Sequence, residues 1–236
     1  MDSMMLHPCS LRLLVSVRNL QEALMAHRVG VDILDVKEPT VGALGKADNL
    51  EIAKIIKAIN GLTPVSAALG EIEECESFFG TGDLPEGLSF AKCGLAGSIH
   101  TNWRNRIDWI WKRIKQSCQP VAVGYADWKV AQSPCPEDIL QHAMESRIGY
   151  FLLDTYAKDG KRCFDKIGIA QLQQLILSAK QKGIRTVLAG TISEGDLDQV
   201  TTLAPDFVGV RGAVCEGGRQ GGISKLRLRE FKSLLT

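Results

Sequence analysis

The segment VAVGYADWKVAQSPCPEDILQHAMESRIGYFLLD, residues 121–154, contains the repeating unit that decides the fold. An apolar run over Val121–Tyr125 precedes a helical pattern over Pro136–Arg147, and a second apolar run follows over Tyr150–Asp154. Proline suits the first turn of a helix, because the N–H that it lacks would have no partner there. A strand, a helix and a strand in this order predict a βαβ unit with two parallel strands.

The same alternation of apolar runs and helical patterns continues on both sides of this segment. The expected strands are Leu11–Val17, Val31–Val36, Pro64–Leu69, Leu88–Leu95, Val121–Tyr125, Tyr150–Asp154, Thr186–Ala189 and Phe207–Val210. Nearly continuous apolar strands indicate a sheet that is covered on both faces. Eight βα units typically need about 250 residues, and the chain has 236. The pattern therefore predicts an α/β fold, a (β/α)8 TIM barrel.

An open, doubly wound parallel sheet is the alternative architecture. No G-x-G-x-x-G motif follows the first expected strand, which weakens a dinucleotide-binding version of that fold. The sequence contains no linker and no low-complexity tract. We therefore expect residues 1–236 to form a single catalytic domain, with residues 1–10 as an N-terminal tail.

Helix starts and one irregular stretch complete the expected architecture. Asn19 with Glu22, and Ser193 with Asp196, have the three-residue spacing of capping pairs. The longest segment without periodicity is Glu71–Gly87. We interpret it as a mobile loop over the mouth of the barrel.

The composition excludes several functional classes. The net charge is +1 at pH 7, so the sequence offers no basic surface for nucleic acid. Seven cysteines occur without a C-x-x-C pair, and the four histidines lack helical metal-binding spacing, so we expect no metal and no other cofactor. The apolar run at Leu11–Val17 is too short to span a membrane, and reduced cysteines fit a cytoplasmic protein.

Charged side chains occur where the expected strands end. In a (β/α)8 barrel the catalytic groups lie at the carboxyl ends of the strands. Asp35 and Lys37 end the second strand and, being two residues apart, leave the same face. Lys92 lies within the apolar fourth strand, Asp154 ends the sixth, and Lys158 follows four residues later. These five residues are the candidate catalytic groups.

Two interpretations of these charges are open from the residues alone. Lys37 and Lys92 can pair with Asp35 and Asp154 as structural ion pairs, because a buried ammonium group needs a partner. Alternatively, burial and neighbouring positive charge lower the pKa of a lysine, which can then act as a Schiff-base nucleophile or a general base. Three lysines and two aspartates near strand ends favour the catalytic interpretation.

The motifs Leu-Ala-Gly-Thr and Val-Arg-Gly-Ala end the last two strands. Barrels commonly bind phosphate at this place, through backbone N–H groups and a helix N-terminus. We therefore expect Gly190, Thr191, Gly212 and Ala213 to bind a phosphate group. Arg211 can add a charged clamp, or its side chain can instead point into the barrel wall.

At these residues the chain resembles the (5-formylfuran-3-yl)methyl phosphate synthase family of methanofuran biosynthesis, and the similarity covers nearly the whole chain. The motifs that carry it are LVS (14–16), DILDVKEP (32–39), GALG (42–45), KCGL (92–95), GYAD (124–127), LDT (153–155), KDGK (158–161), LAG (188–190) and GVRGAVC (209–215). The chain departs from the archaeal members before Leu11 and over residues 71–87. Neither departure removes a motif residue.

The resemblance implies a lyase that condenses two molecules of glyceraldehyde 3-phosphate into a furan aldehyde carrying one phosphate, with loss of inorganic phosphate and water. It implies that Lys37 forms the Schiff base and that Lys92 accepts a proton. Asp35, Asp154 and Lys158 match further active-site positions, and Lys158 is the rival nucleophile. One triose phosphate is expected to become an enediol or imine and attack the aldehyde of the other, before phosphate leaves and the ring closes.

Two other functions stand as alternatives. A class I (Schiff-base) aldolase acting on another sugar phosphate would use similar lysines, whereas a sugar-phosphate sensor would bind without turnover. Release of phosphate with a new ultraviolet-absorbing aldehyde separates the synthase from the aldolase, and turnover by the purified protein excludes the sensor. The expected partner is a triose phosphate, with no nucleic acid or membrane partner, and the sequence leaves a homo-oligomer open.

Overall fold

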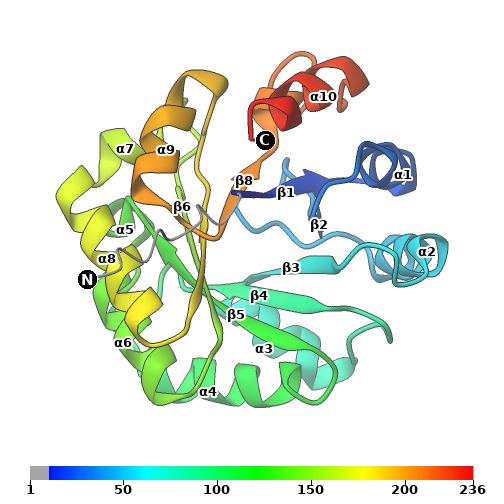
Figure 1. The fold of residues 1–236 in the computed structure, drawn as a ribbon. Coiled ribbons are helices and arrows are strands. Elements are labelled where there is room, and N and C mark those ends of the chain that lie inside the picture. The colour runs from blue at the N-terminus through cyan, green and yellow to red at the C-terminus, as the bar shows by residue number, and fades with distance from the viewer. Residues whose placement is uncertain (1–10, 236) are drawn as a thin grey trace, which may run out of the picture.

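The computed structural model describes residues 11–235, and the expected tail at residues 1–10 lies outside this range. Within it, eight strands form one closed parallel barrel in which the last strand pairs with the first (Figure 1). The strands are β1 (Arg12–Val17), β2 (Ile33–Val36), β3 (Val65–Glu71), β4 (Phe90–Gly94), β5 (Gln119–Tyr125), β6 (Tyr150–Asp154), β7 (Arg185–Leu188) and β8 (Phe207–Val210). The predicted (β/α)8 barrel is confirmed.

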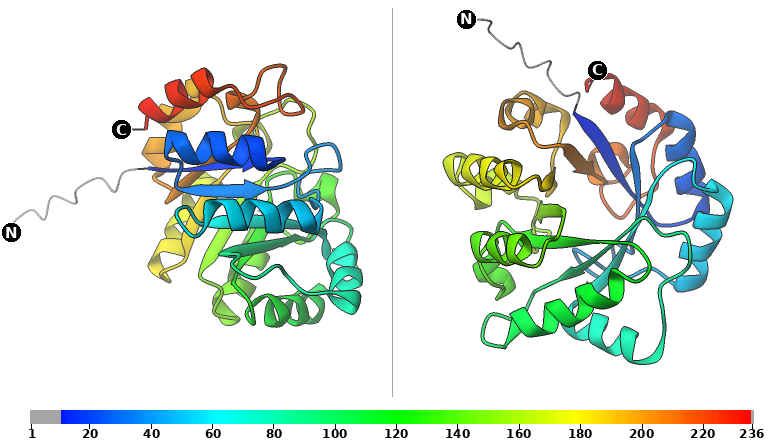
Figure 2. Two further views of the ribbon diagram at one scale, coloured as in Figure 1. Left: turned by 90° about the vertical axis from the view of Figure 1, so that its right-hand side faces the viewer. Right: turned by 60° about the horizontal axis from the view of Figure 1, so that its bottom comes forward.

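Helices follow the strands and surround the barrel (Figure 2). They are α1 (Leu20–Val29), α2 (Asn49–Ile59), α3 (Ile72–Thr81), α4 (Trp103–Ile114), α5 (Trp128–Ala131), α6 (Pro136–Glu145), α7 (Cys163–Lys166), α8 (Ile169–Gln181), α9 (Leu197–Leu203) and α10 (Lys225–Ser233), with 3-10 turns η1 (Glu194–Asp196) and η2 (Gly212–Val214). None of the helices in the described range is long and apolar enough to cross a membrane.

Local sequence signals set several helix starts as predicted. The side chain of Asn19 accepts a hydrogen bond from the backbone N–H of Glu22 at 3.0 Å and so caps α1. Ser193 and Asp196 form a capping box, although the turn that they begin is the 3-10 turn η1, which leads into α9. Pro136 occupies the first turn of α6. These expectations are confirmed.

The segment Glu71–Gly87 is not irregular as predicted, because most of it forms α3. The backbone N–H of Glu71 donates to the carboxylate of Glu74 at 2.8 Å, which stabilises the first turn. Cys75 and Phe79 are buried against the barrel, so α3 belongs to the surrounding ring of helices. Ile72, Cys75 and Phe79, spaced three and four residues apart, are the sequence signal for this helix.

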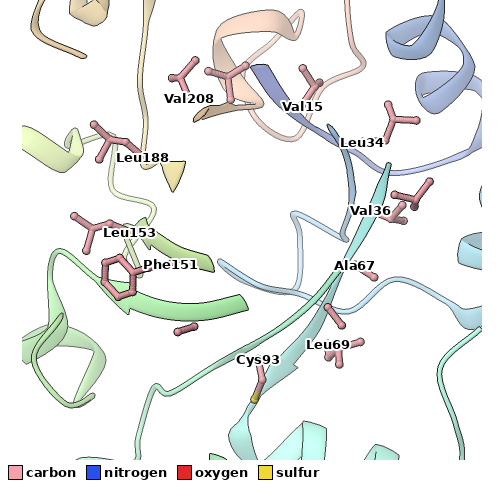
Figure 3. Packing of buried hydrophobic residues seen from close by; sticks show 14 of the residues in the cluster. Val15, Leu34, Val36, Ala67, Leu69, Cys93, Phe151, Leu153, Leu188 and Val208 are labelled. Atoms are coloured by element: carbon pink, nitrogen blue, oxygen red, sulfur yellow. The ribbon is translucent and has the colours of Figure 1, made fainter. Parts of the chain in front are cut away.

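Each strand separates two apolar layers, because successive side chains point to opposite faces. Outward-facing residues such as Val15, Leu34 and Phe151 contact the helices, and Figure 3 shows them on the outer side of the strands. Inward-facing residues such as Leu14 and Ile33 belong to a second cluster that fills the barrel. Burying one such side chain stabilises the fold by about 1.5–3 kcal/mol. The apolar filling forms the floor on which the polar residues of the next layer rest.

Candidate active site

A polar layer lies above the apolar filling, toward the carboxyl ends of the strands. The strand register pairs Ser16 with Asp35 and Asp35 with Ser66, so these three residues form one row across β1, β2 and β3. Lys92 enters the layer from β4, and Asp154 enters from the end of β6. Inward-facing positions of a small closed barrel converge on its axis. Residues far apart in the sequence therefore meet at one site.

Two lysine–aspartate ion pairs occupy this layer. Lys92 Nζ donates to Asp35 Oδ1, and the two side chains are only 3% and 1% exposed. Lys158 Nζ donates to Asp154 Oδ1 at 2.9 Å and to the hydroxyl of Thr155 at 3.2 Å. The cost of desolvation offsets much of the attraction in a buried pair, but removing one partner leaves an uncompensated charge. The two residues of each pair therefore depend on each other for the stability of their charged forms.

Lys37 lies one residue beyond β2, near both pairs, and has no carboxylate of its own. Within residues 11–235 its Nζ forms no salt bridge, and it donates one long hydrogen bond, to Ala43 O at 3.4 Å. Burial lowers the pKa of Lys37 to about 8; the two aspartates oppose this shift and the two paired lysines add to it. About one tenth of the Lys37 side chains therefore carry a neutral amine at pH 7.

The two aspartates keep their charge despite burial. Burial raises the pKa of Asp35, but the positive charges of Lys92 and Lys37 outweigh it and hold the pKa below its usual value. Asp154 follows the same pattern, with Lys158 and Lys37 as the compensating charges. Both carboxylates are therefore ionised at neutral pH.

The five candidate catalytic residues all line one cavity, but their pairing differs from the structural alternative considered above. That alternative paired Lys37 and Lys92 with the two aspartates. In the structure Asp154 forms its ion pair with Lys158 and Asp35 forms its ion pair with Lys92. Among the described residues, Lys37 is therefore the lysine of this cavity without a carboxylate partner. The free amine is thus the group that the resemblance assigned to the Schiff base.

Asp127, the polar residue that follows β5, positions the loop that carries Lys158. Its carboxylate accepts hydrogen bonds from the backbone N–H groups of Tyr156 at 2.6 Å and Ala157 at 2.9 Å. It also forms an ion pair with Lys166 at 2.9 Å. The loop therefore has a fixed anchor just before the lysine.

The cavity has a volume of about 460 Å³, and one part of its wall consists of residues that follow β7 and β8. Gly190, Thr191, Gly212 and Ala213 form part of this wall, and their backbone N–H groups donate to no protein acceptor within the described residues. Gly190 and Thr191 have φ angles of 98° and 55°. Successive N–H groups in such conformations can form an anion-binding concavity.

The sequence left open whether Arg211 clamps a phosphate or points into the barrel wall. In the structure its side chain points into the barrel wall. Its guanidinium donates to the carboxylate of Glu22 at 2.8 Å and to the carbonyl oxygens of Ser16 at 2.9 Å, Arg219 at 2.6 Å and Gly221 at 2.9 Å. These contacts tie the end of β8 to α1. They leave the guanidinium committed to protein acceptors rather than to a phosphate.

Arg219 is a cavity residue that the sequence analysis did not identify. It follows the glycines of the loop after η2 and lines the same cavity. Its guanidinium donates to Gly42 O at 2.9 Å and has no carboxylate partner in the described part of the chain. An arginine between two glycine pairs, in GGRQGG, is the signal that could have identified it.

His27, His100 and His142, the histidines within residues 11–235, do not line this cavity. His27 contacts the hydroxyl of Thr63 at 2.8 Å, and His142 contacts the carboxylate of Asp108 at 2.9 Å. Among residues 11–235, no group of three or more histidine, cysteine, aspartate and glutamate side chains is arranged to hold a metal ion. The candidate acid–base groups of the site are thus lysine and aspartate.

We expect Arg211→Met to lower the free energy of unfolding by about 3–5 kcal/mol, because the buried carboxylate of Glu22 loses its charged partner. Urea denaturation followed by circular dichroism measures this loss. The matched control is Arg18→Met, which removes a partly exposed pair with Glu38 and is expected to cost about 0–1 kcal/mol. Equal losses in the two variants would contradict the role assigned to the buried pair.

Comparisons with known proteins identify the family of this chain. Residues 13–232 match the 4-HFC-P synthase family. The chain is 33% identical over 238 residues to the (5-formylfuran-3-yl)methyl phosphate synthase of Methanothermobacter thermautotrophicus, covering 94% of this chain and 98% of that protein. It is 32% identical over 221 residues to the enzyme of the same name from Methanosarcina acetivorans, covering 90% and 94%.

Among solved structures, phosphoribosyl anthranilate isomerase from Thermotoga maritima resembles this chain with a TM-score of 0.61 at 16% sequence identity, over 95% of this chain and 98% of that chain. At so low an identity the likeness shows the barrel fold alone. The match over residues 13–232, together with relatives about one third identical over nearly their whole length, shows that this chain belongs to the 4-HFC-P synthase family.

Proposed function

We propose that the protein is a (5-formylfuran-3-yl)methyl phosphate synthase, a lyase that condenses two molecules of glyceraldehyde 3-phosphate through a Schiff base on Lys37. The observation that carries the proposal is the buried Lys37 amine, which lies near two ion pairs and has a pKa of about 8. A neutral amine adds to a carbonyl group, and the resulting imine is an electron sink. The product would serve the biosynthesis of a methanofuran-type cofactor, as the resemblance implies.

The wall formed by the residues after β7 and β8 supports a phosphorylated substrate. The unpaired N–H groups of Gly190, Thr191, Gly212 and Ala213 are neutral donors that suit a phosphate group. Both this wall and the three lysines line one cavity. A triose has only three carbons, so a triose whose phosphate binds this wall would have its carbonyl carbon near the lysines. The cavity thus offers both an anion site and a nucleophile.

The carbon skeleton of the product determines which atoms must join. Its phosphomethyl group branches from a ring carbon, and that ring carbon corresponds to the central carbon of the triose that keeps its phosphate. The new bond joins this carbon to the carbon from which the other triose has lost phosphate. Loss of phosphate therefore precedes bond formation, and the attacked carbon is the central one rather than the aldehyde carbon expected from the sequence.

The first triose loses phosphate by elimination. A base removes the proton from its central carbon, the resulting enediol expels phosphate from the third carbon, and the enol of 2-oxopropanal forms. We assign this proton transfer to the Lys92–Asp35 pair as a unit, because the two groups share a hydrogen bond in the cavity. Lys158 and Asp154 lie beside them and can exchange protons with the leaving group.

The second triose becomes the electrophile. Moving a proton from its central carbon to its first carbon converts the aldehyde into a ketone, and Lys37 adds to that ketone and loses water to give the imine. The methylene carbon of the enol attacks the imine carbon, and elimination then releases Lys37 as the free amine. The hydroxymethyl oxygen closes the ring with loss of a second water. The sequence releases one phosphate and two waters, with no net oxidation or reduction.

Borohydride added during turnover of glyceraldehyde 3-phosphate should reduce the imine and leave one triose phosphate on the peptide that contains Lys37. Lys37→Ala should abolish the adduct and also the product, measured by peptide mass spectrometry and by release of phosphate with an ultraviolet-absorbing aldehyde. The matched control is Lys46→Ala, because burial also lowers the pKa of Lys46, which does not line the central cavity. The control should keep both signals.

An adduct that maps to Lys158 and survives Lys37→Ala would overturn the assignment of the nucleophile. An adduct on Lys37 without release of phosphate would instead favour the class I aldolase. Each outcome leaves the barrel and its cavity unchanged.

The rate of imine formation should depend on pH through Lys37. Its pKa of about 8 lies below the usual lysine value, so the neutral amine fraction should rise about tenfold from pH 6 to pH 7 and level off above about pH 9. Single-turnover trapping across this range measures the profile. Lys158→Met should move the inflection to higher pH, because it removes a like charge and frees Asp154 for Lys37. A profile without an inflection near pH 8 would contradict the assignment.

Gly212→Val should raise the KM for glyceraldehyde 3-phosphate about tenfold, because the added side chain would crowd the phosphate away from the backbone N–H groups, at about the cost of one charge-assisted hydrogen bond. A Cβ atom at Gly212 would lie 3.7 Å from its nearest neighbour, so the fold should tolerate the change. Gly222→Val is the matched control, because Gly222 is in the same loop, has no neighbour within 4 Å of an added Cβ and does not line the cavity. An unchanged KM in Gly212→Val would contradict the assignment of the substrate phosphate to this wall.

A further inference from the structure

A second cavity adjoins the first. It has a volume of about 350 Å³ and lies between the loop Pro39–Gly45, after β2, and the loop after β8. Lys158 and Arg219 line both cavities, so they stand at the junction. Lys37 Nζ contacts Ala43 O in the wall of the second cavity, which places this wall beside the proposed nucleophile.

Four successive N–H groups in this wall lack protein acceptors. The backbone N–H groups of Gly42, Ala43, Leu44 and Gly45 donate to no acceptor within the described residues, and Ala43 and Leu44 are only 2% and 1% exposed. More than nine tenths of buried backbone N–H groups in proteins are paired. A run of unpaired donors beside a cavity therefore indicates an acceptor supplied by a ligand.

Arg219 adds the charge that an anion requires. Its main chain lies against Gly212 in the first cavity, and its guanidinium reaches across to Gly42 O at 2.9 Å in the second. Unlike Arg211, it forms no salt bridge among residues 11–235. Most of its donors are therefore free for a group that sits between the two loops, and a planar guanidinium matches phosphate oxygens in pairs.

Part of the second cavity is acidic. Glu71 and Glu74 line it beside the loop Gly42–Gly45, since the backbone N–H of Gly70 donates to Leu44 O at 3.0 Å. The carboxylate of Glu71 accepts hydrogen bonds from Tyr125 Oη at 2.6 Å and Ala96 N at 2.8 Å. Carboxylate oxygens repel a phosphate but accept hydrogen bonds from hydroxyl groups. A phosphorylated triose should thus bind with its phosphate toward Arg219 and its polar carbons away from it.

We propose that the loop Gly42–Gly45 and Arg219 form a second phosphate-binding site, which holds the triose phosphate that does not form the imine. The inference rests on the proposed function insofar as that reaction consumes two triose phosphates. It assigns a role to the motif Gly42-Ala43-Leu44-Gly45 and to an arginine that otherwise has no carboxylate partner. Arg219 is the phosphate-binding residue, and Lys158 lies between the two bound molecules.

Titration calorimetry with sn-glycerol 3-phosphate tests the site without catalysis, because this compound carries the phosphate and the three-carbon chain but no carbonyl group. The wild type should bind two equivalents per chain. Arg219→Gln should bind one equivalent at unchanged affinity, with the second weakened about tenfold to a hundredfold. Arg219→Lys should keep the second site at reduced affinity, because a point charge replaces a planar fork.

Arg227→Gln is the matched control. Arg227 also contacts the loop after β8, through Cys215 O at 3.0 Å, but it lines neither cavity, so this variant should bind two equivalents. One equivalent in the wild type, or two unweakened equivalents in Arg219→Gln, would overturn the proposal. Loss of both equivalents in Arg219→Gln would also overturn it, because that result indicates a structural role.

Catalysis gives an independent readout. Arg219→Gln should still give the borohydride adduct on Lys37, which needs one triose, while the KM for furan formation rises about tenfold or more. Equal losses of adduct and product would contradict a site for the second triose. A wild type that binds two equivalents but forms no furan aldehyde would overturn the proposed function and leave the second phosphate site standing.

Discussion

Three lysine side chains share the interior of a closed barrel with two aspartates, and this imbalance of charge determines the chemistry of the site. Each carboxylate has one ammonium partner, Lys92 for Asp35 and Lys158 for Asp154. A third buried ammonium would have no counter-charge, and burying an uncompensated charge is costly. The imbalance is relieved by a lower pKa at Lys37. The lowered pKa of Lys37 is thus a consequence of its burial and of how the other four groups are paired.

The pairing in turn depends on the register of the barrel. Ser16 donates its hydroxyl hydrogen to Asp35 at 3.1 Å, in a row fixed by the pairing of β1 with β2. A shift of one residue would turn Asp35 outward toward the helices and bring an apolar residue inward. On the other side of the site, Asp127 anchors the loop that brings Lys158 to Asp154. The fold therefore holds each charged group from a different element.

Much of this architecture can be predicted from the sequence because apolar runs, helix caps and strand ends are local signals. The eight strands and the group of lysines and aspartates at their ends follow from such signals. The partner of each lysine does not, because it depends on the stagger between strands, which no local pattern encodes. Helix α3 was missed although Ile72, Cys75 and Phe79 have helical spacing, because Gly80 and Gly82 follow directly and glycines this close together indicate a loop. Arg219 was missed because its position becomes meaningful only when two loops, far apart in sequence, meet over the barrel.

The same charge balance explains why phosphate recognition would fall to backbone groups. Two phosphate monoesters carry about three to four negative charges, and each would raise the pKa of Lys37 and favour its protonated, unreactive form. Additional lysines near the nucleophile would compensate, but they would also compete for Asp35 and Asp154. Neutral N–H donors on two glycine-containing walls would bind anions without disturbing those pairs. A single guanidinium at the junction, Arg219, would then offset part of the added negative charge. In the proposed order of steps, one phosphate departs before the carbon–carbon bond forms. Its departure would remove about half of that charge and so favour the neutral form of Lys37.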